Sequence, residues 1–79
     1  RKKNILNCLI NSQGKVLLGG DPVEIKNISR VVKNKMKENE KLIISVKAHE
    51  KTRYKDYVAV IDQLKTANAK RISIAETAD

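Results

Sequence analysis

Two hydrophobic periodicities alternate along this 79-residue chain, and their order constrains the fold more than any other feature. Short apolar runs indicate strands, whereas apolar residues three or four positions apart indicate helices. Strands are expected at 5–11, 15–18, 42–47 and 71–75, and capped helices at 21–39 and 52–67. Because a strand-helix-strand segment usually leaves its two strands parallel, the order β-β-α-β-α-β predicts an α+β fold. We expect a two-layer sandwich, with both helices on one face of a mixed four-stranded sheet.

Turn and capping residues set the expected boundaries of these elements. Gly14 closes a hairpin turn between the first two strands. After Gly19-Gly20, Asp21 is expected to cap the first helix, with Pro22 in its first position and Glu24 completing a capping box. The second helix is expected to begin after Thr52. Its predicted apolar face comprises Tyr54, Tyr57, Val58, Ile61 and Leu64, with Val60 at the margin.

A chain of this length forms one domain with a thin core, here residues 1–79. Its single cysteine, Cys8, allows no internal disulfide, so self-association or a partner protein is the expected source of further stability. No run approaches the ~18 apolar residues of a membrane-spanning helix. Since the sequence also begins without Met, it is expected to be part of a longer protein.

Enzymatic chemistry finds little support in the sequence. Cys8 lies inside an apolar strand, where a thiol behaves as a small hydrophobic group. His49 has no evident orienting partner beyond Glu50, and Gly19-Gly20 lacks the further glycines and the Lys-Ser/Thr pair of a phosphate-binding loop. We therefore expect no catalytic residues, cofactor or metal.

A formal net charge of +8 favours polyanionic partners. The first helix should carry a basic stripe made of Lys26, Arg30, Lys33 and Lys37. A small nucleic-acid-binding module is thus the alternative hypothesis. It is disfavoured because the only aromatic residues, Tyr54 and Tyr57, are expected on the buried side of their helix, leaving none to stack on bases. No nucleic-acid partner is therefore expected.

The sheet face away from the helices carries the most informative pattern. Alternation along the strands predicts that Leu6, Cys8 and Ile10 face inward, and that their neighbours face outward. The outward set forms a predicted apolar patch of Ile5, Leu9, Leu17 and Ile43, bordered by Lys15 and Lys47. A contiguous apolar patch on a small domain favours a dimer interface or a docked strand.

The same residues resemble a known family. The run 5–20, with its Gly14-Lys15 turn and Gly19-Gly20 ending, resembles the strand-turn-strand opening of ExbD/TolR periplasmic domains. The segments 44–48, 54–65 and 72–75 are similar to the strand, helix and final strand of the second half of those domains. The junction 19–24 resembles ExbD-like proteins of the Bacteroidetes group.

The resemblance implies a non-enzymatic periplasmic domain of a bacterial single-pass inner-membrane protein, with its transmembrane helix ahead of Arg1. It implies a homodimer, contact with an ExbB- or TolQ-like membrane protein through that helix, and energy transduction driven by the proton motive force. The domain would bind a TonB-like protein during transport. Alternatively, it would bind peptidoglycan, as on the TolR side of the family, in the Tol-Pal system.

Overall fold

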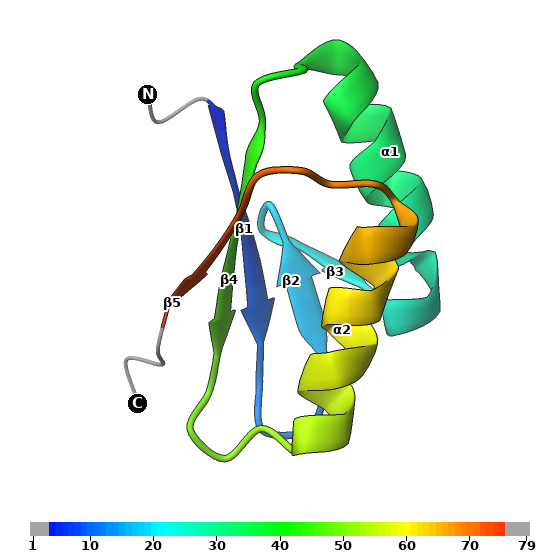
Figure 1. The fold of residues 1–79 in the computed structure, drawn as a ribbon. Helices are drawn as coiled ribbons and strands as arrows, with labels where there is room; N and C mark the ends of the chain where they lie inside the picture. Colours follow the sequence, from blue (N-terminus) through cyan, green and yellow to red (C-terminus); the bar gives the residue numbers. More distant parts are fainter. Residues whose placement is uncertain (1–3, 76–79) are drawn as a thin grey trace.

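The structure, a computed structural model, describes residues 4–75 and forms two layers (Figure 1). One layer is a five-stranded mixed sheet of order β3-β2-β1-β4-β5. The strands are β1 (Ile5–Ile10), β2 (Val16–Leu18), β3 (Asp21–Val23), β4 (Ile43–Ala48) and β5 (Ile72–Ala75). The other layer contains α1 (Ile28–Glu38), preceded by the short 3-10 helix η2 (Ile25–Asn27), and α2 (Tyr54–Thr66). Both helices cover the same sheet face, as the sequence predicted.

The expected start of the first helix at Asp21 and Pro22 is wrong. These residues form β3, an edge strand that pairs antiparallel with β2, and Leu17 lies opposite Pro22. Gly19 and Gly20 have φ values of 63° and 91°, so they form a tight turn of the kind that joins two antiparallel strands. Proline is tolerated at a sheet edge, where its missing N–H costs no ladder hydrogen bond. The chain becomes helical only after Glu24, and the sheet therefore has five strands rather than four.

The additional strand changes the direction of the chain. The sequence predicted that the strands before and after the first helix, β2 and β4, are parallel. In the structure β4 is parallel to β1 and therefore runs opposite to β2. The parallel crossover instead begins at β3, which reverses the chain before α1. The second crossover agrees with the prediction, because β4 and β5 are parallel neighbours.

The core lies between the helices and the inner sheet face. Alternate residues of β1 are buried, and Leu6, Cys8 and Ile10 are 7%, 0% and 2% exposed, as the pattern predicted. The other strands contribute Val16, Leu18, Leu42, Ile44 and Val46 from within or beside them, and the helices contribute Ile28, Val32, Val60 and Leu64. No polar side chain is buried among the described residues, so the contact between the two layers is mainly apolar packing.

The buried face of α2 is rotated relative to the prediction. Val60 and Leu64 are fully buried at its centre, whereas Tyr54 at its first turn is 78% exposed. The expectation that both tyrosines are buried is therefore wrong for Tyr54. Thr52 is not the helix cap either, since Arg53 occupies that position. The Thr52 hydroxyl instead donates to the Ile10 and Asn11 carbonyls, which attaches the start of α2 to the end of β1.

Candidate partner-binding face

No element of residues 4–75 covers the sheet face opposite the helices, and this face carries apolar side chains. Ile5, Leu9 and Leu17 are 43%, 40% and 42% exposed, although each alternates with fully or nearly buried neighbours. Alternation places them on the opposite side of the sheet from the core. We call this side the outer face.

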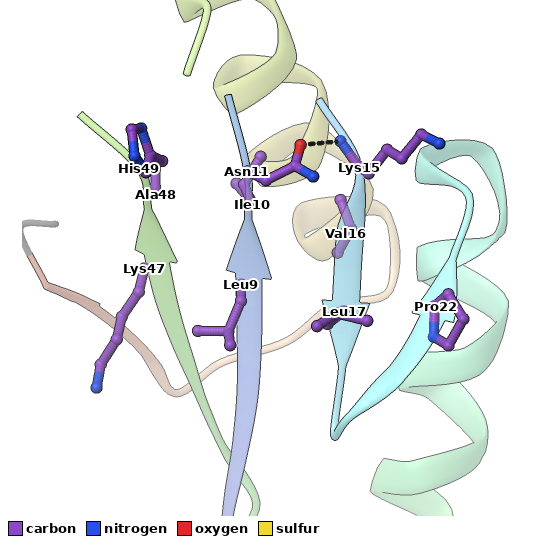
Figure 2. A pocket seen from close by; sticks show the side chains of 10 residues that line it. All are labelled: Leu9, Ile10, Asn11, Lys15, Val16, Leu17, Pro22, Lys47, Ala48 and His49. Carbon is purple, nitrogen blue, oxygen red and sulfur yellow. Dashed lines mark hydrogen bonds between the residues drawn. The ribbon is translucent and has the colours of Figure 1, made fainter. Parts of the chain in front are cut away.

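Strand register brings four outer-face residues into one row. Leu9 lies opposite Leu17 of β2 on one side and Lys47 of β4 on the other, and Leu17 lies opposite Pro22 of β3. Figure 2 shows these four side chains in sequence across the strands. They line a shallow groove of about 460 Å³, which we call the outer groove. Pro22, which the sequence pattern assigned to a helix, is the member that the prediction missed.

The predicted apolar patch is divided rather than contiguous. Ile5 lies opposite Ile43 on the neighbouring strand, but Ile43 is only half-exposed and neither residue lines the outer groove. Between this pair and the groove, Asn7 lies opposite Ser45, which in turn lies opposite Ser73. Because Asn7 is the one residue between Ile5 and Leu9 on the outer face of β1, a polar row crosses the sheet at this level.

One end of the outer groove is formed by the loops after β1 and β4. Asn11 Oδ1 accepts the backbone N–H groups of Gln13 and Lys15, at 2.8 and 2.9 Å, and so fixes the turn that places Lys15 beside the groove (Figure 2). The His49 N–H donates to the Ile10 carbonyl, which brings the two loops together. Lys15 and Lys47, the two lysines that the sequence placed beside the patch, line this groove and supply positive charge at the margins of its apolar floor.

The predicted basic stripe is solvent-exposed. Lys26 lies on η2, and Arg30, Lys33 and Lys37 lie on α1, away from the outer face. Only Lys26 of these four forms an ion pair with a described residue, and its Nζ lies 3.7 Å from Glu24 Oε1. Both side chains of this pair are more than 70% exposed, so the contact adds little stability.

Cys8 and His49, the residues considered for catalysis, each have a structural role in the described chain. Cys8 is fully buried, and burial raises the pKa of its thiol from 9.0 to about 11. A neutral, inaccessible thiol is a poor nucleophile, in agreement with the predicted structural role. His49 Nδ1 accepts the Lys51 N–H at 3.0 Å, so its role in the described structure is to shape a turn. Within residues 4–75, no three His, Cys, Asp or Glu side chains are grouped as metal ligands.

These features define a class of protein before any comparison: a small α+β domain in which one partly apolar face of the sheet is left uncovered by the part of the chain that the structure describes. A search of curated protein sequences finds no match. A family model, described as biopolymer transport protein ExbD/TolR, matches residues 1–79. The chain therefore belongs to the ExbD/TolR family, as its strand and turn pattern suggested.

Membership assigns the chain to the biopolymer transport proteins, which are energy transducers rather than enzymes. Proteins of this family are anchored in the inner membrane and carry periplasmic domains. Among the residues that the structure describes, no helix has both the length and the apolar character needed to cross a bilayer.

Proposed function

We propose that this chain is the periplasmic interaction domain of a transducer driven by the proton motive force. In this role its outer groove binds an extended segment of a TonB-like partner. The observation that carries the proposal is the row of Pro22, Leu17, Leu9 and Lys47 on a sheet face that no element of the described chain covers. Binding would cover the apolar floor and transmit movement between partners, without any covalent step.

The chemistry of the groove specifies the segment that it fits. Leu9, Leu17 and Pro22 offer an apolar floor, which favours apolar side chains on the partner. Lys15 and Lys47 at its margins favour a carboxylate beside them, because a partly desolvated opposite charge fixes the register of a bound segment. The preferred ligand is an extended peptide in which apolar residues alternate with acidic ones.

The proposal includes two further contacts. A transmembrane helix ahead of Arg1 would join an ExbB- or TolQ-like membrane protein. The domain would also form a homodimer, for which exposed Ile5 and half-exposed Ile43, separate from the groove, offer apolar surface. A domain that buries a thin core gains stability from such self-association.

A peptide titration followed by NMR tests the groove assignment. The probe is a ten-residue peptide of alternating Val and Glu, and its matched control carries Lys in place of Glu. We expect the acidic peptide to shift the amide resonances of Leu9, Leu17 and Lys47 most strongly. Lys47→Glu should weaken binding roughly tenfold, since a charge pair becomes a like-charge contact. Lys55→Glu makes the same charge change at an exposed position of α2, and it should leave the affinity for the acidic peptide within about twofold of that of the unchanged chain.

Three results would contradict the proposal: shifts that gather away from the groove, equal losses in both variants, or equal binding of both peptides. Binding of peptidoglycan fragments at the groove, with no peptide response, would instead assign the domain to the TolR branch. Oligonucleotide binding that is abolished by reversing the charge of Arg30 and Lys33 would favour the nucleic-acid alternative.

Sedimentation at increasing protein concentration tests the proposed homodimer. A chain that remains monomeric at millimolar concentration would contradict the homodimer but not the groove assignment.

A further inference from the structure

Three neighbouring parallel strands, β1, β4 and β5, begin at the same end of the molecule, and basic residues precede each of them in the sequence. Lys41 comes shortly before β4, and Lys70-Arg71 lies directly before β5. Arg1-Lys2-Lys3 comes before β1 in the sequence. The strands that they precede are neighbours, in the order β1, β4, β5. Parallel pairing of β4 with β5 therefore brings Lys41 to the same end of the sheet as Lys70 and Arg71, although these residues lie far apart in the sequence.

Hydrogen bonds hold the connecting segments together at this end. Asn39 Nδ2 donates to Asn4 Oδ1 at 2.9 Å, which attaches the segment after α1 to the start of β1. The Ile44 N–H donates to the Arg71 carbonyl at 2.8 Å, which places the start of β5 beside that of β4. Figure 1 shows the start of β1, the end of α1 and the start of β4 at the same end of the molecule.

The charges at this end are exposed and mostly positive. We call the exposed side chains of Lys35, Lys37, Lys41, Lys70 and Arg71 the basic pole. Glu38 and Glu40 are the nearby acidic residues in the sequence, and neither forms an ion pair within 4.0 Å with another described residue. Five positive charges thus stand against two negative ones. A hollow of about 370 Å³ opens among them, with Met36 and Leu42 in its lining together with Lys70, Arg71, Glu40 and Asn68.

We infer that the basic pole binds the anionic phospholipid surface of the membrane in which the protein is anchored. This inference rests on the proposed function, which places a transmembrane helix ahead of Arg1. The described chain enters the fold at Asn4, which is hydrogen-bonded at this pole, so the anchored membrane is the polyanionic surface nearest to it. Basic residues beside a membrane span are attracted by anionic headgroups within about a Debye length.

The contact would orient the domain on the bilayer. With the pole against the headgroups, β1 and β4 run away from the membrane, and the loops after them, at the far end of the outer groove, lie farthest from it. Lys15 and His49 lie in those loops. A membrane-bound domain would therefore present the groove margin to a partner that approaches from the periplasmic side.

Vesicle co-sedimentation of the 79-residue chain tests the inference. The probes are vesicles of phosphatidylglycerol and phosphatidylcholine at 3:7, and vesicles of phosphatidylcholine alone, both at 50 mM and 150 mM salt. We expect partition to the anionic vesicles only, and weaker partition at the higher salt. The double change Lys70→Glu with Arg71→Glu should lower partition at least roughly tenfold.

The matched control is Lys51→Glu with Lys55→Glu, which changes the net charge equally at the opposite end of the molecule. It should lower partition less than about threefold, because those side chains are remote from the bound surface. Circular dichroism verifies that both variants are folded. Equal losses in the two variants, or no partition of the unchanged chain to anionic vesicles, would overturn the inference. Binding of isolated cell-wall sacculi that depends on Lys70 and Arg71, without vesicle binding, would also overturn it.

Failure of this inference is distinguishable from failure of the proposed function. The acidic peptide binds at the outer groove, so its affinity should be unchanged within about twofold in the Lys70→Glu, Arg71→Glu variant. Lost vesicle binding with intact peptide binding would remove only the membrane contact. Intact vesicle binding without any peptide response would remove only the groove assignment.

Discussion

The two faces of the sheet are built from similar residues and differ in what covers them. Leu18 on the inner face is 1% exposed, whereas its neighbour Leu17 on the outer face is 42% exposed. The inner face packs against α1 and α2, but no described element packs against the outer face. The same side-chain type therefore stabilises the fold on one side and remains available for binding on the other.

This difference shows why hydrophobic content alone does not identify a core. Burial of apolar area is favourable wherever the covering layer comes from, whether from the same chain or from a partner. On the inner face the chain supplies that layer itself. The apolar part of the outer face is limited to the groove and the Ile5–Ile43 pair by the polar row of Asn7, Ser45 and Ser73, which restricts a partner to those places.

The largest expected effect comes from the adjacent leucines of β2. Leu18→Ala should destabilise the fold by about 3 kcal/mol, since it removes a buried side chain and leaves a cavity. Leu17→Ala should cost less than about 1 kcal/mol but should weaken binding of the acidic peptide. Urea unfolding measures the first effect, and peptide titration the second. Similar stability losses in both variants would break the comparison between the faces.

The turns on either side of β2 offer a second matched pair. Gly14 has a φ of +82°, and a Cβ added there would lie 2.6 Å from Asp56 Oδ2 on α2. Gly20 has a φ of +91°, but a Cβ would meet no atom within 4 Å. Gly20→Ala should cost about 1 kcal/mol from backbone strain alone, and Gly14→Ala about 2 kcal/mol. Equal losses of unfolding free energy in the two variants would show that the Asp56 side chain moves aside freely. The contact between the Gly14 turn and α2 would then contribute nothing to stability.

Cysteine alkylation compares adjacent positions of β1. The Cys8 pKa of about 11 leaves only about 1% thiolate at pH 9, and burial blocks access as well. Iodoacetamide should therefore react with Cys8 at least roughly a hundredfold more slowly than with a cysteine introduced by Leu9→Cys in a Cys8→Ala chain. Mass spectrometry follows both rates, and urea should abolish the difference. Comparable rates in the folded chains would show that the inner face opens readily.

The raised pKa also predicts a dependence of stability on pH. The unfolded thiol ionises near pH 9.0, whereas the folded thiol remains protonated until about pH 11. Over this interval the unfolded state binds fewer protons, so the free energy of unfolding should decrease as pH rises. The decrease should be smaller in the Cys8→Ala chain, and an identical decrease in both chains would assign it to other groups.

The smallest expected effect on stability comes from the polar row. Asn7→Leu leaves the inner face unchanged and should alter the free energy of unfolding by less than about 0.5 kcal/mol. It would, however, join the groove to the Ile5–Ile43 pair and form one apolar surface, which favours self-association. Sedimentation should show a greater tendency to associate than in Asn7→Ser. No difference between the two variants would mean that the polar row does not limit association.

Sequence reasoning identified the strands around Cys8, Val16, Ile44 and Ile74, because alternation along each strand reports which face is buried. It failed at Asp21-Pro22, where the same residues satisfy two local rules. A Gly-Gly pair followed by Asp-Pro fits a helix start, and a Gly-Gly pair between short apolar runs fits a hairpin turn. Pairing of Pro22 with Leu17 decided between them.

The candidate site was likewise only partly predictable. The outward direction of Leu9 and Lys47 follows from alternation, but their position in one row with Pro22 follows from strand register. The exposure of Tyr54 depends on how α2 is rotated about its axis against the sheet. Periodicity alone placed Val60 at the margin of the buried face, whereas the structure buries Val60 fully and exposes Tyr54.

The sequence by itself determined which strand residues are buried, most of the elements, and the family, because these depend on short-range spacing and side-chain type. Only the tertiary structure decided strand order, the fifth strand, the outer groove and the basic pole. Strand order, the outer groove and the basic pole depend on which distant segments lie side by side, and the fifth strand depends on whether residues 21–23 pair with β2 or begin a helix. Local periodicity carries no information on either choice.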